Sequence, residues 1–201
     1  MAPLSDPTRR HGRDAAAFAA GLGLTALAGT VADRHPSADR RVFAALNDPE
    51  PGPVVPRLLQ QLGTPWVLPA TSLVAAVSGR RHLALAAAVA LPVEKAFEVG
   101  IKKLRPTPRP LYVEPTALRD DAPVEGESFP SGHAAIAFTA AGLVAPHLPT
   151  KAAAAAYFLA AAASLVRVSQ GAHHPLDSVA GAALGLGLAG GLHYAVGRDP
   201  R

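Results

Sequence analysis

Three short segments of the sequence carry side chains suited to binding and transferring one phosphoryl group. An ammonium and two guanidinium groups suit a dianionic tetrahedral group. Two histidines and a carboxylate are the usual equipment for moving such a group from one oxygen to another. The elements between the segments must therefore bring them together. The segments contain Lys102 with Arg109 and Pro110, then Pro130-Ser131-Gly132-His133, then Arg167 with His173 and Asp177.

The second segment opens an apolar run and is typical of a helix N-terminus that binds an anion. Ser131 can cap this helix, so that backbone N–H groups and the positive end of the helix dipole point at the phosphate. Gly132 permits a close approach of the phosphate. His133 is then expected in the first helical turn, where it can protonate the leaving oxygen.

The third segment is predicted to supply the nucleophile. Asp177 follows His173 by four residues and can fix the tautomer of the imidazole and stabilise its charged form. His173 then attacks phosphorus and forms a phosphohistidine that water hydrolyses. Lys102, Arg109 and Arg167 hold the equatorial oxygens and stabilise the developing charge. This mechanism requires no metal and no other cofactor.

The elements between the segments are predicted to be membrane-spanning helices. Hydrophobic residues make up 49% of the 201 residues and charged residues 17%, below the roughly 25% of soluble domains. Several apolar stretches need flanking residues to reach the roughly 20 residues that cross a bilayer. We therefore expect an all-α bundle of six transmembrane helices. The predicted spans cover about 15–32, 65–78, 83–101, 133–145, 152–166 and 178–196.

The remaining segments complete a single predicted membrane domain over residues 15–196. Residues 1–14 form a predicted N-terminal cytoplasmic tail, and 197–201 a C-terminal tail. Between the first two spans, residues 38–46 predict a short amphipathic helix in the membrane interface. The stretch 105–130, rich in proline and acidic residues, predicts a polar loop over the site.

Alternation of the six spans puts all three segments on one side of the membrane. Lys102 follows the third span, His133 opens the fourth, and the third segment links the fifth and sixth. Clustered arginines precede the first span and follow the second, which indicates that the opposite end faces the cytoplasm. We therefore expect an integral protein of the plasma membrane whose site faces the non-cytoplasmic side.

Charged residues of the third predicted span fall on one helix face. Glu94, Glu98 and Lys102 recur every four residues. Charges of a span usually face the bundle interior or an aqueous cavity. We predict an i,i+4 ion pair from Glu98 to Lys102 that orients the lysine, with direct substrate contact as the alternative.

Composition excludes several other classes of protein. Cysteine is absent, which excludes disulfides and thiolate metal sites. No basic run with interleaved aromatic residues appears, so nucleic acid is not an expected partner. The stretches 152–166 and 178–196 show almost no charged stripe, which argues against a soluble bundle. The sequence specifies no oligomeric state.

The three segments resemble the signature motifs of the PAP2 superfamily, the type 2 phosphatidic acid phosphatases. Their order and internal spacing carry the resemblance, as Lys102-x6-Arg109-Pro110, Pro130-Ser131-Gly132-His133 and Arg167-x5-His173-x3-Asp177. One departure is Val166, where the family usually has serine. The resemblance implies that His173 is the nucleophile, His133 the acid and Asp177 the partner of His173. It implies phosphate binding by Lys102, Arg109, Ser131, Gly132 and Arg167.

The resemblance further implies a metal-independent phosphatase that removes a terminal phosphate from a membrane lipid phosphate or diphosphate. Phosphatidic acid, phosphatidylglycerol phosphate and polyprenyl phosphates or diphosphates all fit. Two alternatives within the superfamily are a vanadate-binding haloperoxidase and a secreted non-specific acid phosphatase, with residues 15–32 as a cleaved signal peptide. A third alternative is a non-catalytic protein that binds or transports lipid phosphates.

Overall fold

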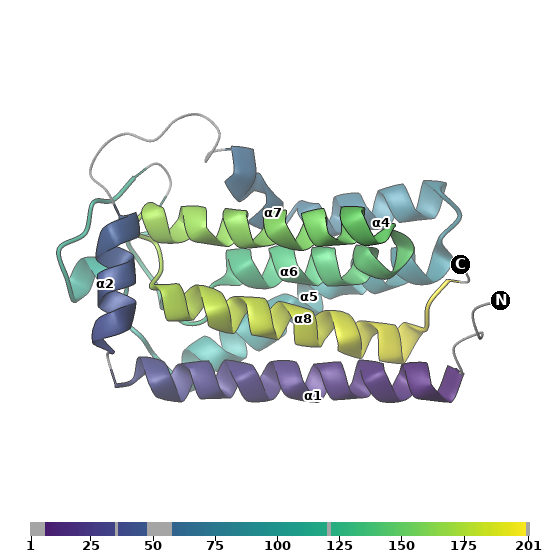
Figure 1. Cartoon of the computed structure of the whole chain (residues 1–201), viewed down its shortest axis with the longest axis horizontal. Coiled ribbons are helices and arrows are strands. Elements are labelled where there is room, and N and C mark those ends of the chain that lie inside the picture. The colour runs from purple at the N-terminus through teal and green to yellow at the C-terminus, as the bar shows by residue number, and fades with distance from the viewer. Residues whose placement is uncertain (1–6, 35, 48–57, 120–121, 200–201) are drawn as a thin grey trace.

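The computed structural model describes residues 7–34, 36–47, 58–119 and 122–199, and the regular elements within them are helices (Figure 1). The long helices run back and forth between the two ends of an elongated bundle. The all-α prediction is therefore confirmed. The long helices are α1 (Pro7–Ala32), α4 (Val67–Val77), α5 (Arg81–Leu104), α6 (Gly132–Val144), α7 (Thr150–Ser169) and α8 (Pro175–Val196).

Among the described residues, three helices are long and apolar enough to cross a membrane: α1 over Thr8–Ala32, α7 and α8. The other predicted spans overlap α4, α5 and α6. Because α4 has 11 residues and α6 has 13, neither alone covers a hydrocarbon core of about 30 Å at about 1.5 Å per residue. α5 has 24 residues but includes five charged side chains in its C-terminal half, so six membrane crossings stay a prediction. These side chains are Glu94, Lys95, Glu98, Lys102 and Lys103.

The first helix begins before its predicted start. Residues 7–14, assigned to the N-terminal tail, form the first turns of α1, and residues 1–6 lie outside the described residues. Asp14 is buried and forms an ion pair with Arg198, which follows α8. The early turns of α1 thus have a partner in the fold, which their sequence pattern did not predict.

The short helix α2 (Ser37–Leu46) lies across one end of the bundle, opposite the end where α1 begins and α8 ends (Figure 1). It matches the helix predicted over 38–46. Its Phe43 is buried, with its ring centroid 5.5 Å from that of His174. The Asp39 Oδ1 atom accepts the backbone N–H of Leu176 at 3.0 Å. α2 is therefore fixed to the beginning of α8, while its place in the membrane interface stays a prediction.

Glycines on α8 let the neighbouring helices approach closely. A Cβ atom at Gly181 would overlap the carbonyl oxygen of Ser131, and one at Gly187 would press on the Cα of Gly21 in α1. Small residues at such positions allow helix backbones to pack against one another. The N-termini of α6 and α8 are joined directly, since the Ser131 N–H donates to the Asp177 carbonyl at 3.0 Å. The second and third segments therefore meet.

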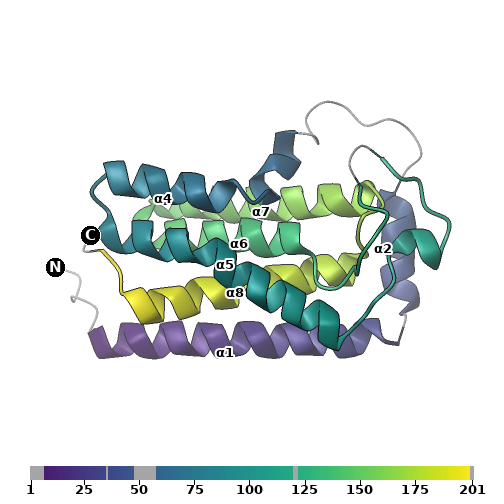
Figure 2. The ribbon, with the colours of Figure 1, turned by 180° about the vertical axis from the view of Figure 1, so that it is seen from behind.

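The stretch predicted as a polar loop connects α5 to α6 at the α2 end of the bundle (Figure 2). It contains one turn of 3-10 helix, η2 (Pro110–Tyr112), and residues 120–121 lie outside the described residues. Asn47 binds both the N–H and the C=O of Ala117 at 2.8 Å, and its Nδ2 also donates to the carbonyl of Ser169 at 2.9 Å. The loop is thereby tied to the ends of α2 and α7.

Candidate active site

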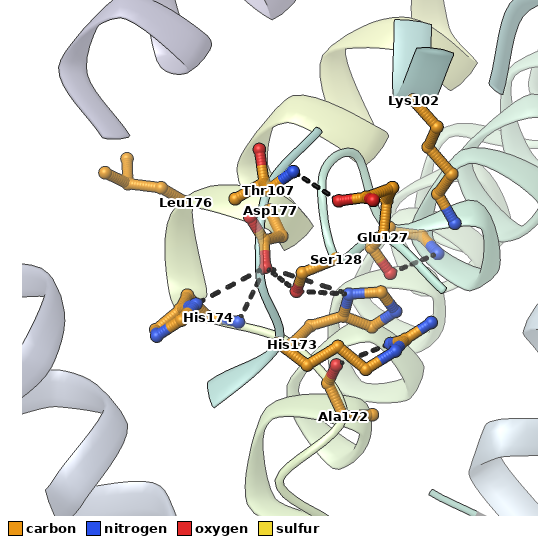
Figure 3. Close-up of polar contacts among 12 residues, drawn as sticks. Lys102, Thr107, Glu127, Ser128, Ala172, His173, His174, Leu176 and Asp177 are labelled. Carbon is orange, nitrogen blue, oxygen red and sulfur yellow. Dashed lines mark hydrogen bonds and ion pairs between the residues drawn. The ribbon is translucent and has the colours of Figure 1, made fainter. Parts of the chain in front are cut away.

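The first and third segments meet at the end of the bundle that α2 covers (Figure 3). The second segment joins them there, because the Ser131 N–H donates to the Asp177 carbonyl. Lys102 is in the last turn of α5, and Arg167 is in the last turn of α7. His173 and His174 lie in the connection to α8, and Asp177 is in the first turn of that helix. The helix ends that carry the segments thus meet at the same place.

Asp177 is the centre of a buried hydrogen-bond cluster. Its Oδ2 atom accepts the Ser128 hydroxyl at 2.5 Å and the backbone N–H of His174 at 2.8 Å. The same oxygen lies 3.8 Å from Nδ1 of His173, and the Ser128 oxygen lies 3.4 Å from that nitrogen (Figure 3). Since Nδ1 faces Ser128 and Asp177, Nε2 is the nitrogen directed away from them. The arrangement orients the imidazole with its Nε2 available for attack.

Burial sets the protonation of His173. Only 3% of this residue is exposed, and this burial lowers the pKa of the imidazole below its usual 6.5. Asp177 opposes the effect, while the positive charges of Arg109 and Lys102 add to it. The lowered pKa favours a neutral ring near neutral pH, which a nucleophile requires.

Two buried guanidinium groups lie at the site. Arg109 donates from Nε to the Glu125 carbonyl at 2.8 Å and from Nη1 to the Ala172 carbonyl at 2.9 Å. Arg167 donates from Nη1 to the Gln170 and Gln60 side-chain oxygens at 2.7 and 3.1 Å. These acceptors are neutral, and the carboxylates of Asp177, Glu98 and Glu127 act on Arg109 only through their charge.

The two guanidinium groups also lie close enough to influence each other. Burial lowers the pKa of Arg109, and the charge of Arg167 lowers it further. Two buried cations side by side favour an anionic ligand, because an anion would offset both the repulsion and the cost of burial.

Lys102 is held by the ion pair that the sequence predicts. Its Nζ donates to Glu98 Oε1 at 2.7 Å, and Lys95 binds the other carboxylate oxygen. The Glu98 carboxylate lies against Gly132, since a Cβ atom there would come within 2.5 Å of Oε1. The pair therefore brings the ammonium of Lys102 to the N-terminus of α6.

The N-terminus of α6 faces this cluster. Ser131 is its N-cap, and the Ser131 hydroxyl accepts the N–H of Ala134 at 3.4 Å. Gly132 is the first helical residue, and the half-buried His133 is the second. The backbone and Cβ of His133 lie against Gly63 of η1 (Gln61–Gly63), where a larger residue would collide. Only a glycine at position 63 allows η1 to pack this closely on α6.

His174 differs from its neighbour. Its Nε2 lies 2.7 Å from Glu114 Oε1, and its Nδ1 lies 3.7 Å from Asp177 Oδ2. Burial lowers the pKa of His174, but the two carboxylates outweigh burial and raise it above 6.5. The His174 ring thus links Glu114 of the loop to Asp177 in the first turn of α8.

Sequence reasoning assigned no role to Ser128 and Glu114, which both contact the histidines. Ser128 precedes the second segment, and its hydroxyl joins Asp177 to His173. The sequence offered one indication that Ser128 lies near the site, which is its position two residues before Pro130 of the second segment. Nothing in the spacing of Glu114 indicated that it would meet His174, because the contact depends on the path of the loop.

Comparisons with known proteins agree with this geometry. A family model described as the PAP2 superfamily matches residues 81–201, a range that begins with α5 and contains all three segments. The crystal structure of LpxE from Aquifex aeolicus matches with a TM-score of 0.67 and 22% sequence identity, over 80% of this chain and 96% of that chain. No curated protein matches the sequence. The likeness to LpxE concerns the fold.

Proposed function

The chain belongs to the PAP2 superfamily, and on this premise we propose that it is a membrane lipid phosphatase. It removes the terminal phosphate from a lipid phosphate or diphosphate through a phosphohistidine. The observation that carries the proposal is the buried His173, oriented by Asp177 and Ser128 beside two buried guanidinium groups. A nucleophile and an anion site are thereby combined.

In the proposed reaction, the phosphate is held by Arg109, Arg167 and Lys102, with the N-terminus of α6 offering Gly132 and Ser131. His173 Nε2 attacks phosphorus as the bond to the lipid oxygen breaks. His133 gives its proton to that oxygen, and the lipid alcohol leaves. Asp177 stabilises the positive charge that His173 gains. Phosphate-site residues stabilise the charge of the transferring group.

The second half of the reaction restores the enzyme. His133, now neutral, accepts a proton from a water molecule that attacks phosphorus. The bond from phosphorus to Nε2 breaks, inorganic phosphate leaves, and His133 and His173 return to their starting protonation states. No residue outside the three segments has to donate or accept a proton.

We further propose that the six long helices cross the plasma membrane and that the site faces the non-cytoplasmic side. The three apolar helices α1, α7 and α8 support membrane insertion. α1 packs closely on α8 at Gly21 and Gly187. This packing makes α1 part of the fold and argues against its removal as a cleaved signal peptide. Clustered arginines near the beginning of α1 support the orientation.

Phosphate release from purified protein tests the activity. Wild type, His173→Ala and His11→Ala are incubated with phosphatidic acid, phosphatidylglycerol phosphate and polyprenyl phosphates in the presence of EDTA. We expect release by wild type and by His11→Ala, whose side chain lies at the opposite end of the bundle, and none by His173→Ala. Equal release by wild type and His173→Ala would overturn the proposed nucleophile.

A single cysteine tests the orientation. Val124 is exposed in the loop, and the natural sequence has no cysteine to give background labelling. In intact cells, an impermeant maleimide is expected to label V124C without lysis. Labelling that appears only after lysis would place the site in the cytoplasm.

A further inference from the structure

A polar pocket lies at the end of the bundle opposite the proposed active site. Its volume is about 300 Å³. Three parts of the chain that are far apart in the sequence meet around it: the first turns of α1, the turn η3 (Ala145–His147) between α6 and α7, and the residues that follow α8. The ionisable residues that line the pocket are Arg10, Arg13, Asp14, His147, Arg198 and Asp199.

This pocket has an excess of positive charge. Three guanidinium groups line it with two carboxylates, and both carboxylates already bind groups of the protein. Asp14 is buried and forms an ion pair with Arg198. Asp199 accepts two backbone N–H groups at the beginning of α5, at 3.1 and 3.0 Å. Arg13 is exposed and forms no ion pair with any residue that the structure describes. The pocket is therefore suited to an anionic group.

An apolar groove of about 430 Å³ adjoins the pocket. It follows α4, which lies in the half of the bundle where α1 begins and α8 ends (Figures 1 and 2). His147 lines both the pocket and the groove. Leu83 of the groove also donates its N–H to Asp199 of the pocket at 3.0 Å. The apolar residues of the groove include Val67, Ala70, Val74, Leu83, Val144 and Leu148.

The length of the groove corresponds to one leaflet of a bilayer. From Val67 to Ser78 it follows α4 for about 16 Å at about 1.5 Å per residue, close to half of a hydrocarbon core of about 30 Å. Arg80, which follows α4, adds a cation at the end where the groove meets the pocket. A cationic pocket joined to an apolar groove of this length matches the shape and charge of one phospholipid.

We propose that the pocket and the groove together bind one anionic phospholipid of the leaflet opposite the proposed active site. Its phosphodiester lies among Arg10, Arg13 and Arg198, and one of its hydrocarbon chains lies along α4. The excess of positive charge favours an anionic headgroup over a zwitterionic one. Neither the pocket nor the groove is lined by a residue of the three segments, so the lipid is not a substrate and the inference goes beyond the proposed function.

Trp66 can report whether a chain occupies the groove. It is the one tryptophan of the sequence, and it is 79% exposed. It directly precedes Val67 and lies four residues before Ala70, so it shares a helix face with residues that line the groove. Bromine atoms on a lipid chain quench indole fluorescence on contact. A brominated chain in the groove therefore quenches Trp66.

The first test compares two lipids in nanodiscs. The discs hold the protein in equal parts of phosphatidylglycerol and phosphatidylcholine, and one of the two lipids at a time carries dibrominated chains. We expect quenching of Trp66 in wild type to give a relative binding constant that favours phosphatidylglycerol about fivefold or more. Equal quenching by the two lipids would overturn the inference.

Two arginine variants locate the headgroup. Arg9 and Arg13 are both exposed and lie one turn apart on α1, but only Arg13 lines the pocket. We expect Arg13→Gln to reduce the preference for phosphatidylglycerol about fivefold and Arg9→Gln to leave it within about twofold of wild type. Equal losses in the two variants would mean that the lipid is attracted by the whole basic surface, and the site would fail.

Inorganic phosphate distinguishes a phospholipid from a free anion. It is added in excess to the wild-type nanodiscs, and chloride at equal ionic strength serves as the control. We expect the same preference for phosphatidylglycerol in both salts, because free phosphate leaves the groove empty. A loss of the preference in phosphate alone would mean that the pocket binds a free anion, which would overturn the inference.

Two valine variants test the chain separately from the charge. Val74 and Val77 are both exposed on α4, at 62% and 78%, but only Val74 lines the groove. We expect Val74→Phe to fill the groove and to bring quenching by brominated phosphatidylglycerol down to the level of phosphatidylcholine, whereas Val77→Phe should behave as wild type. Both variants keep every arginine, so this test stands even if Arg13→Gln does not fold. The same quenching in the two valine variants would overturn the inference.

Discussion

His173 and His174 are adjacent and share one carboxylate, yet the two sides of Asp177 give them opposite properties. On one side, burial and the charges of Arg109 and Lys102 lower the pKa of His173. On the other, Asp177 and Glu114 raise the pKa of His174 despite its burial. The charge of a histidine here depends on which elements reach it, and not on its position in the sequence.

The difference divides the work between the two rings. The lowered pKa of His173 favours a ring with a lone pair for attack, and the raised pKa of His174 favours a charged ring beside the carboxylate that orients His173. The backbone N–H of His174 also donates to that carboxylate, so Asp177 is fixed before any substrate arrives. We therefore expect substitutions on the His173 side to change the chemical step and those on the His174 side to change its positioning.

Replacing each histidine by alanine should give the largest contrast. His173→Ala removes the proposed nucleophile, and we expect kcat for phosphate release to fall by about a thousandfold or more. His174→Ala leaves the nucleophile and the backbone N–H that binds Asp177, so we expect a loss of about tenfold. Initial rates on one lipid phosphate measure both, and equal losses would mean that the two sides are not distinct.

Ser128→Ala should have the next largest effect. Its hydroxyl is buried and donates to Asp177 beside Nδ1 of His173, so its removal leaves a buried carboxylate with one bond fewer. Such a loss costs about 1–3 kcal/mol, or about five- to 150-fold in kcat. KM should change little, since Ser128 lies behind the nucleophile.

A conservative substitution at Ser128 distinguishes the positioning of His173 by its hydroxyl from a general contribution to the fold. Ser128→Thr keeps the hydroxyl and should recover most of the activity. If Ser128→Ala instead raised KM alone, the serine would contact substrate and would not act through His173.

The pH dependence of kcat/KM should reveal the lowered pKa of His173. Protonation blocks attack, so the rate falls as pH drops through the pKa of the free enzyme, which lies below 6.5. Lys102→Met removes a positive charge that favours the neutral ring. The acid limb, meaning the part of the pH profile where kcat/KM falls with falling pH, should therefore move to higher pH in this variant, whatever the overall loss in rate. A limb that stays in place, or moves to lower pH, would show that the charge of Lys102 does not lower the pKa of the imidazole.

The sequence predicted the parts of the site that lie in regular patterns. Segment spacing and apolar stretches gave the helices, and the i,i+4 spacing gave the ion pair from Glu98 to Lys102. Ser128 and Glu114 were missed because a loop brings them to the histidines, and loop paths depend on contacts such as those of Asn47. Short apolar runs identified α4 and α6 without showing whether they cross the bilayer.

Glu114→Gln should produce the smallest effect and the sharpest comparison. Glu114 raises the pKa of His174 together with Asp177, so its neutral replacement lowers that pKa but leaves one carboxylate in place. We expect a loss of about two- to threefold in kcat near neutral pH, corresponding to about 0.5 kcal/mol. The difference from wild type should shrink as pH falls, because His174 is protonated in both proteins at acid pH. The acid limb set by His173 should not move; a shift in that limb would mean that the charge of His174 reaches the nucleophile and that Asp177 does not separate the two sides.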